Sequence, residues 1–124
     1  MKSSLKQKAM TLWGKIIHQQ FGDCCAKCKT TAGKMEAHHI GGRQSNAMGL
    51  DLELGILLCD ECHLYAPDAP HRDHQAFMKW LEEAYPQKFQ RYQESRHKII
   101  FDRDFDIKTI TAQLRSEAKH FAIA

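Results

Sequence analysis

The sequence predicts an α+β fold in which a compact ββα-like centre lies between helices. Two segments, 35–40 and 52–58, are short and apolar or alternating, which favours strands. The regions on either side have apolar residues at helical spacing instead. We therefore expect a two-stranded unit with one N-terminal helix and two or three C-terminal helices. Two Cys-x2-Cys pairs bracket this unit: Cys25/Cys28 and Cys59/Cys62.

The length of 124 residues is typical of a single domain. We expect one domain over 1–124, with its core at about 21–80 and a helical C-terminal extension over 81–124. No apolar run approaches the ~20 residues that a membrane span needs. Residues 1–5 are polar and lack the apolar stretch of a signal peptide. These features predict a cytoplasmic protein that does not bind a membrane.

The helices are expected in four segments. Apolar residues near 3.6-residue spacing predict an amphipathic helix over 5–20. A second helix is predicted over 73–84. Pro86 suits the first turn of a third helix, which would cover Ile99. Asp106 is a suitable N-cap for the last one.

The two cysteine pairs are expected to bind one structural Zn²⁺. Four thiolates suit tetrahedral zinc and leave no position open for catalysis. A reducing compartment disfavours the alternative of disulfides. Cys24 could replace Cys25 as a ligand, but the x2 spacing is the commoner one, which favours Cys25. Such a site would join two distant segments and stabilise a small core.

Three histidines lie between or beside the cysteine pairs: His38, His39 and His63. Neighbouring side chains of a strand point to opposite faces, so His38 and His39 cannot share one task. One could hold a metal ion while the other faces a scissile phosphate. A bound zinc would also bring Cys62 near Cys25, and His63 with it toward the histidine pair.

This pattern resembles the HNH nuclease family, especially its small zinc-binding members from bacteriophages and prophages. The resemblance covers about residues 24–63. It rests on the cysteine pairs, Glu-Ala-His-His-Ile at 36–40, Gly-Gly-Arg at 41–43 and the apolar run before Cys59. It implies a ββα-metal fold with a catalytic divalent ion, Mg²⁺ or Mn²⁺, besides the structural zinc.

The resemblance also implies a role for each residue at the matching positions. His38 and His63 would be ligands of the catalytic ion, and His39 the general base that activates water. Arg43, in the Gly-rich loop, is expected to contact a phosphate. The implied activity is that of a DNA endonuclease, which nicks or cuts both strands in phage recombination, packaging or processing. The chain would then act in the host cytoplasm.

One departure from the family pattern concerns the general base. The family usually has an asparagine five residues before the third cysteine, and this residue holds the base in place. Here the position is Leu54. Three outcomes are open: another polar residue such as Asn46 substitutes, the enzyme is slower, or the domain has become a binding module.

A second departure concerns the metal ligands. Many relatives have a histidine one helical turn after the position of His63, where this chain has Pro67. His71 and His74 follow in the next few residues. We expect one of them to fold back as a ligand, and His71 is the preferred candidate.

DNA is the expected partner. Residues 1–50 have eight basic and two acidic residues, whereas 51–124 have ten basic and thirteen acidic ones. A basic half can follow phosphates. The competing hypothesis is a catalytically weak or inactive zinc module that binds DNA or protein, which would need neither His39 nor a second ion. The sequence does not distinguish a monomer from a homodimer.

Overall fold

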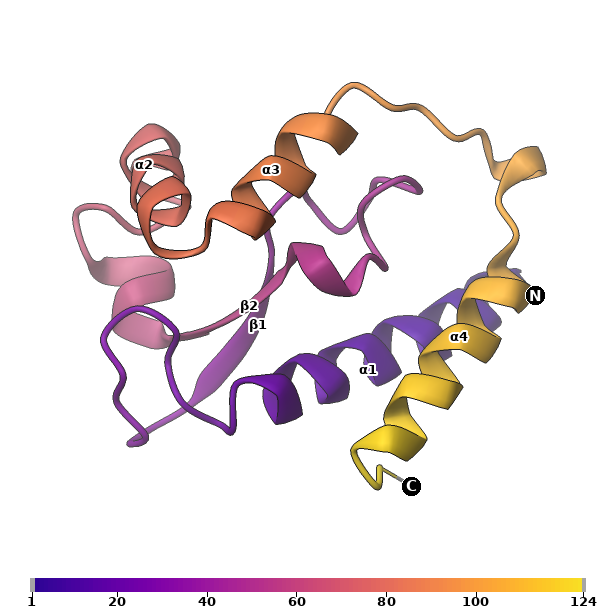
Figure 1. Cartoon of the computed structure of the whole chain (residues 1–124), viewed down its shortest axis with the longest axis horizontal. Helices are drawn as coiled ribbons and strands as arrows, with labels where there is room; N and C mark the ends of the chain where they lie inside the picture. Colours follow the sequence, from indigo (N-terminus) through magenta and orange to yellow (C-terminus); the bar gives the residue numbers. More distant parts are fainter. Residues whose placement is uncertain (1, 124) are drawn as a thin grey trace.

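The computed structural model describes residues 2–123 and confirms the α+β class, with a two-stranded antiparallel sheet among helices (Figure 1). The longer elements are α1 (Lys2–Gln20), β1 (Met35–His39), β2 (Gly55–Cys59), α2 (His74–Ala84), α3 (Pro86–Ser95) and α4 (Ile107–His120). Three short helical turns complete the fold: η1 (Leu52–Leu54), η2 (Glu61–Tyr65) and η3 (Asp102–Asp104). No helix in the part of the chain described here is long and apolar enough to cross a membrane.

Most predicted helices are confirmed. The one over 5–20 begins three residues earlier, at Lys2, and ends at Gln20 as expected. The helix α2 begins after Asp73, whose side chain accepts a hydrogen bond from the Ala76 amide. Asp106 caps α4 in the same way, with the Thr109 amide as donor. Pro86 is in the first turn of α3.

Two details of the prediction are wrong. The segment 52–58 is not all strand, because the Asp51 side chain accepts a hydrogen bond from the Glu53 amide and starts the turn η1, so that β2 begins only at Gly55. Ile99 does not lie beneath the third helix. That helix ends at Ser95, and Ile99 is 78% exposed in the segment that leads to η3 and α4.

The core forms where α1 crosses the sheet. Every residue of β2 is buried, and Trp13, Ile16 and Ile17 of α1 are buried with them. On the other side α1 packs along α4, whose Leu114 and Ala118 join the same core (Figure 1). The centre has two strands followed by a helical segment, in the order β1–β2–η2, as a ββα-like unit would. The helical segment η2, however, is a single turn of five residues.

The close approach of α1 to β2 depends on Gly55. A Cβ atom at this position would meet the side chain of Ile17 and would lie 2.7 Å from Cζ2 of Trp13. Such an approach is closer than van der Waals contact allows. A glycine in the strand, which by propensity alone would weaken it, is therefore required by packing.

We expect Gly55→Ala to destabilise the fold by about 1–3 kcal/mol through overpacking. The matched control is Gly14→Ala in α1, where a Cβ atom meets nothing within 4 Å and helix propensity favours alanine. Urea unfolding of both variants measures the difference. A Gly55 variant as stable as the wild type would show that α1 and β2 are less closely packed.

Candidate functional site

The four paired cysteines converge at one point. Their sulfur atoms all lie within 4.8 Å of one another, although the pairs are some 30 residues apart in sequence. The Sγ atoms of Cys28 and Cys59 are 3.6 Å apart. Two thiolates bound to a tetrahedral zinc at about 2.3 Å would be about 3.8 Å apart, so the spacing fits such an ion. The cluster could therefore hold a metal ion such as zinc.

Cys24 is outside this cluster. Its thiol points to the backbone carbonyls of Cys25 and Lys29. The loop is attached to the sheet through the Ala26 amide, which donates to the Leu57 carbonyl at 2.8 Å. Cys25, beside this bond, is fully buried in the cluster, whereas Cys24 is only partly buried and is not part of it. The x2 spacing thus correctly predicted that Cys25, and not Cys24, belongs to the cluster.

The cysteines differ in their readiness to ionise. Burial alone would raise the pKa of Cys25, but hydrogen bonds from the backbone of Cys59, Cys28 and Lys27 lower it to about 6. Burial raises the pKa of Cys59 and of Cys62. Without a cation these last two thiols keep their protons at neutral pH. A metal ion bound in the cluster would displace these protons. The free energy of metal binding would then also stabilise the fold.

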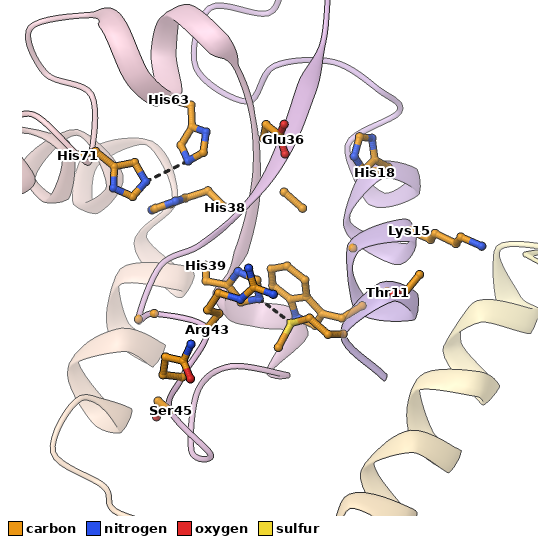
Figure 2. A pocket seen from close by; sticks show the side chains of 17 residues that line it. Thr11, Lys15, His18, Glu36, His38, His39, Arg43, Ser45, His63 and His71 are labelled. Carbon is orange, nitrogen blue, oxygen red and sulfur yellow. Dashed lines mark hydrogen bonds between the residues drawn. The ribbon is translucent and has the colours of Figure 1, made fainter. Parts of the chain in front are cut away.

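A second cluster contains His38, His63 and His71. One ring nitrogen of each lies within 4.8 Å of the others, and Nε2 of His63 is 3.2 Å from Nε2 of His71 (Figure 2). Two imidazoles bound to a tetrahedral ion at about 2.1 Å would be about 3.4 Å apart. The three rings therefore fit one metal ion and would leave a coordination position open.

The segment after η2 brings His71 into this cluster. The Arg72 amide donates to the carbonyl of Ala69, and the Arg72 guanidinium donates to the Tyr65 carbonyl at 2.8 Å. These bonds fold the segment back over η2. His74, the other candidate, begins α2, and its ring faces Tyr92 instead.

Two imidazoles of this cluster, His38 and His63, are neutral at pH 7 because their pKa values are lowered. Burial and, after it, the neighbouring histidines, His63 most, together lower the pKa of His38 to about 3. Burial and then His71 lower the pKa of His63 as well. In addition, Nδ1 of His63 is buried and has no hydrogen-bond partner among the described residues. Neutral imidazole is the form that binds metals, so the cluster is prepared for an ion.

His39 faces the other side of β1, as expected for neighbouring residues of a strand. Its ring stacks on Trp13 of α1, with centroids 3.9 Å apart and planes inclined by 12°. Its Nε2 lies 3.0 Å from Sδ of Met10. Burial, followed by the charge of Arg43, lowers the pKa of His39 to about 4, against a backbone hydrogen bond at Gly49 that raises it. At neutral pH the ring can accept a proton.

Asn46 does not take the place of the missing asparagine. Its Nδ2 donates to the carbonyl of Ile100 and to Asp102, and its Oδ1 accepts from Lys6. It joins the loop to the segment before α4 and makes no hydrogen bond with His39. Leu54, at the family's asparagine position, is 1% exposed and part of the core. The hypothesis that Asn46 substitutes is therefore wrong.

The backbone hydrogen bond between Gly49 and the ring of His39 was not predicted from the sequence. A Cβ atom on Gly49 would lie 2.6 Å from the carbonyl oxygen of Arg43 and 2.8 Å from that of Ser45. Only glycine allows the loop to close so tightly that its backbone reaches the ring. Because the contact is made by the backbone, no polar side chain in the sequence could have indicated it.

Both faces of β1 open into one cleft of about 1010 Å³ (Figure 2). Its walls are α1, β1, the loop 41–45 and the rings of His63 and His71. Lys15 and Arg43 line it as cations, and Glu36 is the only acid among the described lining residues. Glu36 is paired with Lys34 at 3.0 Å. The cleft can therefore receive an anionic group between the histidine cluster and His39.

No protein-family model, curated protein or solved structure matches this chain. The resemblance to HNH nucleases consequently stays an expectation from the sequence of residues 24–63. Every residue that it named for the site, from Cys25 to His71, lies either in one of the two clusters or along the cleft.

We expect Cys25→Ser to lose most of the bound zinc and on the order of 5 kcal/mol or more of stability, because metal binding and folding are coupled. Cys24→Ser is the matched control and should retain both. Zinc content after gel filtration and thermal unfolding measure the two effects. Full zinc occupancy in the Cys25 variant would contradict this assignment.

We expect His71→Gln to weaken binding of a second divalent ion by at least about tenfold. His74→Gln, three residues away and outside the cluster, should bind normally. Titration of the zinc-loaded protein with Mn²⁺ or Ni²⁺ in a calorimeter gives both affinities. Equal affinities would remove His71 from the metal site.

Proposed function

We propose that this protein is a metal-dependent endonuclease that hydrolyses phosphodiester bonds of DNA. One observation supports it above the others. A three-imidazole cluster and a separate neutral imidazole lie on opposite faces of one strand and open into the same cationic cleft. Hydrolysis of a phosphodiester needs these two functions, a cation on the phosphate and a base for the water.

In this proposal the residues have separate tasks. An ion held by His38, His63 and His71 would neutralise charge on the phosphate and stabilise the leaving 3′ oxygen. His39 takes the proton of the attacking water, and stacking on Trp13 keeps its ring plane fixed. Arg43, in the loop that lines the cleft, binds the phosphate. The expected ends are 5′-phosphate and 3′-hydroxyl.

The ligand set bears on which ion is used. Mg²⁺ prefers oxygen ligands and keeps several waters, whereas imidazole suits transition metals such as zinc and nickel. Three imidazole ligands therefore favour Mn²⁺, or another transition ion, over Mg²⁺. Four thiolates, in contrast, would close the coordination of zinc in the other cluster and give it a structural role only.

A binding module without catalysis is the second candidate, and one contact favours it. The Met10 thioether covers Nε2 of His39, with Sδ 3.0 Å from this nitrogen, and would compete with a water for it. Leu54 is buried in the core, and the only side chain among residues 2–123 that makes a hydrogen-bond contact with a ring nitrogen of His39 is the Met10 thioether. Methionine is flexible enough to move aside when a substrate enters, so the contact slows the proposed enzyme without excluding it.

The decisive experiment follows supercoiled plasmid DNA with Mn²⁺ or Mg²⁺. We expect conversion to open circles or linear DNA, about 10²–10⁴-fold slower for His39→Ala because its base is lost. His97→Ala, an exposed histidine outside the cleft, is the matched control and should cut normally. EDTA should stop the reaction.

The same experiment separates the two candidates. A wild-type protein that contains zinc and binds DNA, yet leaves the plasmid supercoiled with every divalent ion, would contradict the endonuclease and support the binding module. Equal rates for His39→Ala and the wild type would instead remove His39 from the reaction.

A further inference from the structure

We propose that a groove between α1 and α4 binds the phosphate backbone of duplex DNA beyond the scissile bond. This inference rests on the proposed function, since it takes the same DNA to be the ligand. The groove has a volume of about 600 Å³ and lies beside the candidate cleft. Its cations come from both helices: Lys8, Lys15, Arg115 and Lys119. None of the described residues that line it is acidic.

Helical spacing explains why these cations share one face. Lys8 and Lys15 are seven residues apart, which is two turns of α1, or roughly 10 Å along its axis. Arg115 and Lys119 are four residues apart on α4 and so lie one turn apart. The sequence of α1 contains no acidic residue at all. Glu117 of α4 lines a different cavity, together with Asn46 and Leu50.

These four side chains are exposed, and none of them forms an ion pair with any residue in the range 2–123. Some cations elsewhere in the protein are paired, as Lys27 is with Asp68 and Arg91 with Asp51. Four unpaired like charges around one groove repel each other, and a polyanion relieves that repulsion while it releases its counterions. The charge pattern therefore fits a nucleic-acid backbone.

The groove is continuous with the candidate cleft. Thr11 and Lys15 line both. Figure 2 shows Lys15 extending from α1 away from the histidines and toward the helix drawn beside it, which is α4. A DNA strand with one phosphate near His38 can therefore follow α1 outward and meet Arg115 and Lys119. Contacts of this kind position DNA and carry no information on its sequence.

The test is a triple variant, Lys8→Gln/Arg115→Gln/Lys119→Gln, which leaves the cleft residues Lys15 and Arg43 in place. Its binding to a duplex of about 30 bp, roughly three helical turns, is measured by fluorescence anisotropy from about 50 to 200 mM salt. The protein is loaded with zinc only, so that no DNA is cut. We expect the slope of log affinity against log salt to fall by about 0.9 for each lost contact, or about 2.7 in all.

The matched control removes the same three charges elsewhere, in Lys79→Gln/Arg96→Gln/Lys98→Gln, on α2 and just after α3. These residues are exposed and do not line the groove. We expect the control to keep nearly the wild-type slope. Thermal unfolding of both variants verifies that they are folded. Equal slopes for the two triple variants, or a slope loss confined to duplex RNA, would overturn the inference.

The salt-dependence test and the plasmid test can contradict the groove inference and the nuclease proposal separately. If the wild type cuts plasmid and the groove variant keeps its salt slope, the groove inference is overturned and the nuclease stands. If the groove variant loses the slope and the wild type never cuts, the groove stands and the nuclease is overturned.

Discussion

The convergence of four cysteine sulfurs is the constraint on which the rest of the site depends. Cys25 and Cys28 follow α1, Cys59 ends β2, and Cys62 lies in η2. Joining them holds the end of α1 against the sheet and fixes where η2 begins. His63 is the next residue after Cys62, so its ring is placed by the same junction. The histidine cluster thus depends on the cysteine cluster, although the two share no residue.

The second constraint is the alternation of side chains along β1. It separates His38 from His39, so that one ring joins a histidine cluster that could hold a metal ion, while its neighbour stacks on Trp13. Burial keeps both rings neutral, with pKa values of about 3 and about 4. Two adjacent residues of the same type therefore have different surroundings and can have different chemistry. On a helix the two side chains would point only about 100° apart and would not lie on opposite faces.

The features that the sequence could predict are those with a period or a fixed spacing. Apolar periodicity predicted α1 and α2, and the x2 spacing selected Cys25 over Cys24. The misses are contacts between residues with no such relation. Asn46 bonds to the segment before α4 and not to His39, and the contact at Gly49 is made by backbone. Such contacts depend on how a loop closes, which neither composition nor periodicity encodes.

Helix α1 links the core, the site and the surface charge. Its inner face contributes Trp13, which both fills the space over Gly55 and stacks on His39. Its outer face carries Lys8 and Lys15, which line the groove toward α4. A rigid helix cannot move one face without the other. DNA bound along the lysines would therefore be held at a fixed position relative to His39, and only the flexible Met10 side chain would have to move for the ring to meet a phosphate.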